Sequence, residues 1–119
     1  MIQEISNNYC VSRDDVFVVG HSLGASFTHE LACRRGEVIH GVSAVAGPGF
    51  NGKCTGPSAS LLFHRTDDKL VPFASGKAAE VIRKTVNECS STTTNVMIGG
   101  FACKQRTDCS TGNPVVWCE

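Results

Sequence analysis

A short apolar strand that runs straight into Gly-x-Ser-x-Gly constrains this chain more than any other stretch. Residues 16–19 read Val-Phe-Val-Val, and four successive β-branched or aromatic residues predict a strand buried on both faces. The pentapeptide from Gly20 to Gly24 follows at once, and residues 23–34 behind it have the pattern of a helix. This order is typical of a nucleophile elbow, a tight turn that holds one serine in a strained backbone conformation. Ser22 is therefore the candidate nucleophile.

The residues around Ser22 have distinct expected roles. We expect a Cβ at Gly20 or Gly24 to strike the neighbouring strand or helix, so that glycine leaves room for the turn. Leu23 begins the helix, and its backbone N–H is expected to bind a developing oxyanion. A lone Gly-x-Ser-x-Gly also arises by chance, so the flanking strand and helix carry the prediction.

An acidic loop follows another predicted strand. Residues 60–64 read Ser-Leu-Leu-Phe-His and predict a buried strand, and Asp67 and Asp68 come directly after it. Because ligands and catalytic groups gather at the carboxyl ends of strands in open α/β sheets, we expect this loop to share a sheet edge with Ser22. A carboxylate there can orient a catalytic histidine and stabilise its protonated form. Two adjacent aspartates also form an ordinary solvated turn, which is the alternative interpretation.

The remaining pattern predicts an α/β fold of three layers, with a mostly parallel sheet and helical crossovers. The expected helices cover residues 2–9, 23–34 and 76–89, and the other expected strands cover 38–47, 60–64 and the stretch from 115. Residues 50–58 are expected to form a surface loop, fastened through Cys54, and residues 90–113 a second loop that Cys103 and Cys109 could clip.

Apolar spacing predicts which helix faces point inward. The first helix is expected to pack on the sheet through Ile2, Ile5 and Tyr9. In the second, Phe27 and Leu31 are expected to face inward and His29 to lie on the polar or boundary face. In the third, the expected inward residues are Ala79, Val81, Ile82 and Val86, and the expected outward residues are Lys77, Glu80, Arg83 and Lys84.

Charge and length exclude several classes of partner. The chain has 119 residues, enough for one domain at most, and its 11 lysines and arginines balance its 11 aspartates and glutamates. We therefore expect no nucleic acid or anionic membrane surface as partner. No apolar run approaches the roughly 20 residues of a membrane span, and the first residues lack the pattern of a signal peptide.

Seven cysteines are many for a chain of this size. They are spread out without a Cys-x-x-Cys pair, which favours disulfides in an oxidising compartment over a zinc site. Because the number is odd, at least one is free, bonded to another chain, or separated from a partner outside this sequence. A secreted type of cysteine content without a signal peptide leads us to expect further N-terminal sequence in the complete protein.

Several motifs together resemble one esterase family. The elbow from Gly20 to Gly24, residues 64–73 (His-Arg-Thr-Asp-Asp-Lys-Leu-Val-Pro-Phe), residues 87–90 (Asn-Glu-Cys-Ser) and residues 115–118 (Val-Val-Trp-Cys) are similar to segments of secreted feruloyl esterases. These belong with the poly(3-hydroxybutyrate)-depolymerase-like esterases of the α/β-hydrolase superfamily. The family's loop runs His-Gly-Thr-x-Asp-x-x-Val-Pro-Tyr, and its aspartate is the acid of a Ser-Asp-His triad. The resemblance gives that role to Asp68 and leaves Asp67 at the variable position.

Departures from the family pattern also carry information. Arg65 stands where the family prefers glycine, and Phe73 where it prefers tyrosine. The family's histidine lies a few residues beyond the Val-Trp-Cys strand, whereas the four histidines here, His21, His29, His40 and His64, all precede Asp68. The resemblance therefore implies that residues 1–119 are the C-terminal part of one α/β-hydrolase catalytic domain, without its N-terminal strands and without the segment that bears the catalytic histidine. The elbow strand, first in this chain, would then be an exposed edge.

The activity expected of the complete protein is serine ester hydrolysis without a metal or organic cofactor. The resemblance implies a secreted, extracellular feruloyl esterase that releases hydroxycinnamic acids from plant cell-wall polysaccharide, with residues 1–119 inactive on their own. Acetylxylan esterase and polyester depolymerase remain alternatives within the class. A non-catalytic, disulfide-braced binding module with a hydrolase-like fold is the alternative of another class. The sequence does not determine the oligomeric state.

Overall fold

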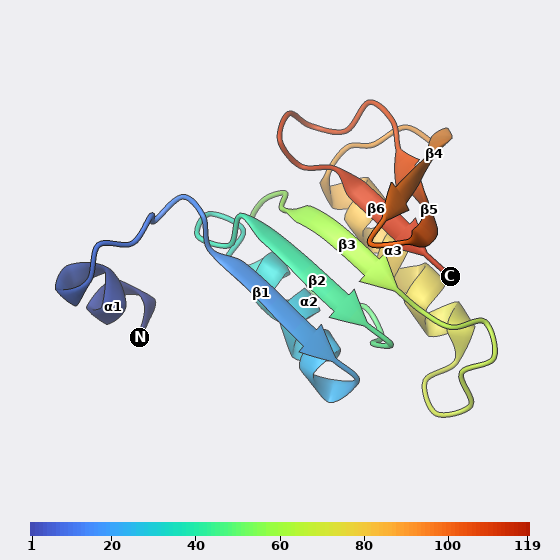
Figure 1. Ribbon diagram of the computed structural model, residues 1–119, viewed down its shortest axis with the longest axis horizontal. Coiled ribbons are helices and arrows are strands. Elements are labelled where there is room, and N and C mark those ends of the chain that lie inside the picture. The colour runs from blue at the N-terminus through green and yellow to red at the C-terminus, as the bar shows by residue number, and fades with distance from the viewer.

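A six-stranded, mostly parallel sheet organises the computed structural model, which describes all residues from Met1 to Glu119 (Figure 1). The helices are α1 (Ile2–Asn8), α2 (Leu23–Arg34) and α3 (Phe73–Val86). The strands are β1 (Phe17–His21), β2 (Gly41–Val45), β3 (Ala59–Phe63), β4 (Thr93–Ile98), β5 (Phe101–Arg106) and β6 (Val115–Cys118). Their order in the sheet is β1-β2-β3-β6-β5-β4, with the first four parallel and the β4–β5 hairpin antiparallel to β6. The predicted α/β class is confirmed.

Helices α2 and α3 both cover the same face of the sheet. The α2 helix packs on β1 and β2, and α3 packs on β3 and β6. The two helices also touch each other, because Arg83 of α3 donates to the His29 carbonyl of α2 at 3.1 Å. Figure 1 shows both helices behind the sheet. Residues 1–119 therefore form two layers, and the predicted third layer is not among them.

Small side chains on α2 let this helix lie close to the sheet. Ala25 packs with Ala44, Leu62 and Trp117, and Ala32 packs with Ile39 and Val42. The expectation that Phe27 faces inward is wrong, since 58% of it is exposed, and so is the boundary position expected for His29, which is only 1% exposed. The physical reason is that alanines form the sheet-facing stripe of α2, while His29 lies on the side covered by α3.

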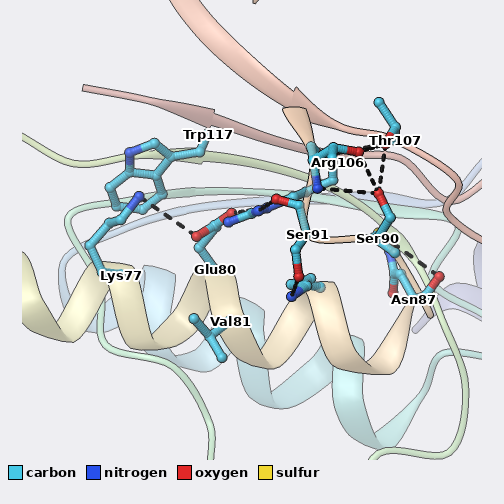
Figure 2. Close-up of polar contacts among 12 residues, drawn as sticks. Lys77, Glu80, Val81, Asn87, Ser90, Ser91, Arg106, Thr107 and Trp117 are labelled. Carbon is cyan, nitrogen blue, oxygen red and sulfur yellow. Dashed lines mark hydrogen bonds and ion pairs between the residues drawn. The ribbon is translucent and has the colours of Figure 1, made fainter. Parts of the chain in front are cut away.

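The buried face of α3 also differs from the expected one. Glu80 and Arg83, expected to point outward, are 2% and 1% exposed, whereas Val81 is 52% exposed. Glu80 is buried because it pairs with Arg106 of β5 at 2.6 Å and with Lys77 at 3.6 Å (Figure 2). Buried charges of this kind are tolerated only when they are paired, so the ion pair that joins α3 to the hairpin overrides the apolar pattern.

The first helix and the first strand are more exposed than expected. Helix α1 has no buried residue and stands off to one side, beyond β1 (Figure 1). The expectation that it packs on the sheet is therefore wrong, because none of its residues is buried against another element. Strand β1 is the edge of the sheet, as predicted, but it is not buried on both faces: Phe17 and Val19 are 62% and 74% exposed. They point away from α2, which covers only one face.

The hairpin β4–β5 occupies residues that we expected to form a loop. Gly99 and Gly100 join the two strands with φ values of 54° and 87°. A two-residue turn with positive φ at both positions matches the right-handed twist of the flanking strands, and glycine adopts it without steric penalty. This Gly-Gly pair was the sequence signal for the hairpin.

Three disulfides join neighbouring segments of the fold. Cys33–Cys54 ties the 50–58 loop to α2 and confirms the expected anchoring through Cys54. Cys89–Cys109 joins the end of α3 to the segment after β5, and Cys103–Cys118 joins paired positions of β5 and β6. Cys10 is free and exposed. Closing loops of this length stabilises a chain by about 3 kcal/mol each in the chain-entropy model.

Candidate active site

Ser22 lies at the sharp turn between β1 and α2. Its backbone has φ 55° and ψ −119°, a conformation that a residue with a side chain rarely adopts. The Ser22 N–H donates to the Val45 carbonyl of β2 at 2.9 Å, and the Ser22 carbonyl accepts from Ala25 and Ser26 at the start of α2. Such a residue is held against a strain of about 1–3 kcal/mol by the structure around it. The turn thus combines a strained serine with fixed contacts on both sides.

The two glycines of the pentapeptide play different roles. A Cβ on Gly20 would lie 2.2 Å from the Gly24 carbonyl oxygen and 2.4 Å from Thr28 Oγ1, so β1 and α2 meet where only glycine fits. For Gly24, the expectation that a Cβ would strike the neighbouring strand or helix is wrong, because a Cβ there would have no atom within 4 Å. Gly24 is close to Gly20 through its backbone carbonyl and leaves open space on its own Cα. Leu23 is the first residue of α2, so its N–H has no acceptor within the helix.

The strand ends of β1, β2, β3 and β6 form one row. His21 pairs with Val45, Val45 with Phe63, and Phe63 with Cys118. Ser22 follows β1 and the 64–73 loop follows β3, so both project from this edge with β2 between them.

The Asp68 carboxylate is anchored through one oxygen. Its Oδ1 accepts hydrogen bonds from the N–H groups of Leu70 and Val71, each at 2.9 Å. These bonds, with Val71 first and Leu70 second, lower the pKa of Asp68, and the nearby His64 and Arg65 side chains add to the effect. The group is therefore ionised at neutral pH. Its Oδ2 lies 3.7 Å from His64 Nε2.

Asp67 has a different environment. Its carboxylate forms a two-pronged pair with Arg65, at 2.9 Å and 2.8 Å, and the two side chains are 65% and 81% exposed. An exposed pair of this kind contributes about 0–1 kcal/mol. The environment of Asp67 is that of a solvated turn, whereas Asp68 is anchored by the backbone.

The four histidines lie at separate places. His40 precedes β2, so it lies at the amino ends of the strands whereas Ser22 lies at their carboxyl ends, and the His40 ring contacts Phe17. His29 is buried on α2, where burial and the positive charge of Arg83 lower its pKa to about 4. His21 is exposed at the end of β1, and His64 is buried beneath the 65–70 turn.

The surroundings of His64 were not foreseen from the sequence. Its ring stacks on Trp117 of β6 with centroids 6.3 Å apart and meets Phe73 of α3 edge to face at 6.0 Å. A Cβ on Gly76 would lie 2.2 Å from His64 Nδ1, so that glycine makes room for the ring. An isolated glycine inside a helical pattern is the one sequence signal for such a close approach.

No group of three histidine, cysteine, aspartate or glutamate side chains is arranged to hold a metal ion. A hollow of about 960 Å³ lies between α1, the start of β1 and α2, and neither Ser22 nor Asp68 lines it. Ser22 and Asp68 therefore lie at the carboxyl ends of the strands and not in this hollow.

None of the helices is long and apolar enough to span a lipid bilayer.

Comparison with known proteins gives one informative similarity. The chain is 28% identical to feruloyl esterase D of Neurospora crassa over 123 residues. The similarity takes in 98% of this chain but only 42% of that protein, so the chain spans about two fifths of the length of the relative it matches. No family model matches the chain. The similarity supports a relation to feruloyl esterases at a coarse level.

Proposed function

We propose that this chain is part of a serine carboxylic-ester hydrolase in which Ser22 is the nucleophile. The observation that carries the proposal is the Ser22 backbone, held at positive φ between a parallel strand and the start of a helix, where Gly20 leaves no room for a Cβ. Strain of this kind persists where the surrounding structure imposes it, and it clusters at functional sites. The relation to a feruloyl esterase supports the same chemical class.

The proposal includes an assignment of fold and domain. Four neighbouring parallel strands, with the elbow between the first strand and α2 and the acid loop after the third, fit the C-terminal part of one α/β-hydrolase catalytic domain. In this assignment the strands that would pair with the free edge of β1 lie outside residues 1–119. Three disulfides fit a secreted, extracellular protein.

The mechanism assigns one step to each residue. Ser22 Oγ attacks the ester carbonyl while a histidine takes its proton, and the alcohol leaves to give an acyl-enzyme that water then hydrolyses. The Leu23 N–H donates to the oxyanion. Asp68 Oδ2 accepts the second ring N–H of that histidine, whose tautomer is thereby fixed.

The proposal places the general base outside residues 1–119. His29 and His64 are buried and His40 lies at the amino ends of the strands. His21 is exposed on the strand face that carries Phe17 and Val19, turned away from α2. In this proposal a separate segment therefore supplies the imidazole.

We propose feruloylated plant cell-wall polysaccharide as the substrate class. The relative is a feruloyl esterase, and the 64–73 loop and the Val-Val-Trp-Cys strand are the segments that carry the family resemblance. The acyl group is recognised by pocket walls that residues 1–119 sample only in part. A panel of methyl ferulate, acetylated xylan and a short hydroxybutyrate ester assigns the acyl class by the highest kcat/KM.

The central test replaces the proposed nucleophile in the full-length protein. Ser22→Ala removes the attacking oxygen, so ester hydrolysis should fall on the order of 10⁶-fold while the circular dichroism spectrum stays unchanged. Ser6→Ala, on α1 and outside the proposed site, is the matched control and should keep wild-type turnover. Unchanged hydrolysis in folded Ser22→Ala would refute the proposal. A labelled fluorophosphonate that does not react with the wild-type protein would favour a binding module instead.

A further inference from the structure

Both backbone polar groups of Val71, its N–H and its carbonyl, are held by side chains. Its N–H donates to Asp68 Oδ1 at 2.9 Å, and its carbonyl lies 2.9 Å from His64 Nε2. A carbonyl can only accept, so His64 Nε2 must carry a proton and donate it. Asp68 and His64 thus hold the same residue, one through the amide that precedes its Cα and the other through the amide that follows it.

The His64 ring has little freedom to move. Trp117 stacks on one face of the ring, Phe73 meets its edge, and Gly76 of α3 lies against Nδ1. The His64 side chain is 1% exposed. Trp117 is itself buried in the core with Ala25, Ala44 and Leu62, and Lys77 lies 4.5 Å from the centroid of its ring (Figure 2). The core therefore fixes the donor that holds Val71.

This arrangement controls where Asp68 points. With Oδ1 occupied by two backbone N–H groups, Oδ2 is the oxygen left for an incoming histidine. If the Val71 backbone shifted, its N–H would no longer meet Oδ1 in the same way and the direction of Oδ2 would change. His64 Nε2 itself stays 3.7 Å from Oδ2, beyond hydrogen-bond distance, because its proton is directed at Val71.

We propose that His64 is a positioning residue for Asp68. It holds the Val71 backbone in place through the bond from Nε2–H to the Val71 carbonyl and so presents Asp68 Oδ2 to the general base. This inference rests on the proposed function, since Asp68 needs a fixed direction only if it orients a catalytic histidine. His64 does not touch the substrate, and its buried ring does not exchange a proton with Ser22.

Two amide substitutions in the full-length protein separate this role from others. In His64→Gln the side-chain amide nitrogen takes the place of Nε2 and can still donate to the Val71 carbonyl. In His64→Asn the amide is shorter, occupies the Nδ1 position and cannot reach. The pair keeps a neutral polar group in the same enclosure and differs mainly in the reach of the donor.

The expected result is a loss of turnover in one variant alone. His64→Asn should lower kcat for methyl ferulate about 100-fold with little change in KM, the usual consequence of a misplaced catalytic group. Its reaction with a fluorophosphonate should slow by a similar factor. His64→Gln should keep kcat within about threefold and retain the acid limb of the kcat/KM profile, because the general base in this proposal is another histidine.

Three outcomes would be decisive. If folded His64→Asn keeps wild-type kcat while Ser22→Ala is inactive, the positioning role is wrong and the esterase proposal stands. If folded His64→Gln is as inactive as Ser22→Ala, His64 does more than position Asp68 and the inference is likewise overturned. If Ser22→Ala remains active, the proposed function fails first. Where His64→Asn does not fold, retained kcat and an unchanged acid limb in His64→Gln still support the role.

Discussion

Ser22 and Asp68 project from the same sheet edge, yet the elbow is held by backbone contacts and the acid loop by side chains. The Ser22 turn is fixed by its N–H bond to Val45 and by the close approach of Gly20 to the Gly24 carbonyl. The Asp68 turn depends on its own carboxylate and on His64, which is enclosed by Trp117 and Phe73. A contact between backbone groups persists through most side-chain substitutions, except at a glycine on which the close approach depends. A contact made by side chains can be removed one group at a time.

The largest expected difference is between the two neighbouring aspartates. Asp68→Asn removes the charge that orients the histidine while keeping the side chain's size, so kcat should fall on the order of 10³- to 10⁴-fold in the full-length protein. Asp67→Asn breaks only an exposed pair with Arg65 and should leave kcat near the wild-type value. Steady-state hydrolysis of methyl ferulate measures both. The reverse order of effects would transfer the acid's role to Asp67.

The elbow should be sensitive at one glycine and tolerant at the other. Gly20→Ala places a Cβ 2.2 Å from a backbone oxygen that cannot move without disturbing α2, and it should lower the free energy of unfolding by about 3 kcal/mol. Gly24→Ala meets no atom within 4 Å and adds a good helix former near the start of α2, so stability should hold or rise slightly. Urea unfolding of the two variants gives the comparison. Equal losses would contradict the steric difference between them.

A smaller effect concerns how the free energy of unfolding depends on pH through His29 of α2. Burial, together with Arg83, lowers the pKa of His29 from 6.5 to about 4, so the unfolded chain binds a proton in this range and the folded chain does not. Stability therefore falls as the pH drops from 6.5 towards 4, and His29 contributes about 2 kcal/mol of loss between pH 7 and about pH 5. His29→Gln should remove this part of the pH dependence of urea unfolding. A wild-type slope in His29→Gln would count against the prediction.

The backbone-held half of the site could be predicted because its constraint is local. A strand, a Gly-x-Ser-x-Gly and a helix are contiguous, and the structure has β1, Ser22 and α2 in that order. The steric requirement was nevertheless assigned to both glycines, since sequence alone does not reveal that Gly24 faces open space. The acid loop could be placed after β3, but its support comes from Gly76 in the next helix and from Trp117 on β6, contacts that the local sequence does not reveal.

The faces of the helices were harder to predict, for an electrostatic reason. Apolar spacing ranks glutamate and arginine as outward-facing, but Glu80 is buried because Arg106 lies opposite it, 26 residues along the chain. Arg83 is buried against the His29 carbonyl, the Ser58 hydroxyl and Cys33 Sγ. Because these partners are far away in the sequence, the apolar periodicity of a single helix does not reveal which of its charged residues are buried. The β4–β5 hairpin differs, because its Gly-Gly turn is local but its strands lie in a stretch that is polar overall.

The disulfide between Cys103 and Cys118 affects what proteolytic cleavage does to the protein. Loop tips with small polar residues are preferred cleavage sites, and residues 110–113, Ser-Thr-Gly-Asn, form such a tip between β5 and β6. A cut there would divide the polypeptide in two without releasing the last strand, because Cys118 would remain covalently tethered to Cys103. The severed piece carries Trp117, so the clipped molecule would keep the aromatic surface on which His64 rests until a reductant opened the bond.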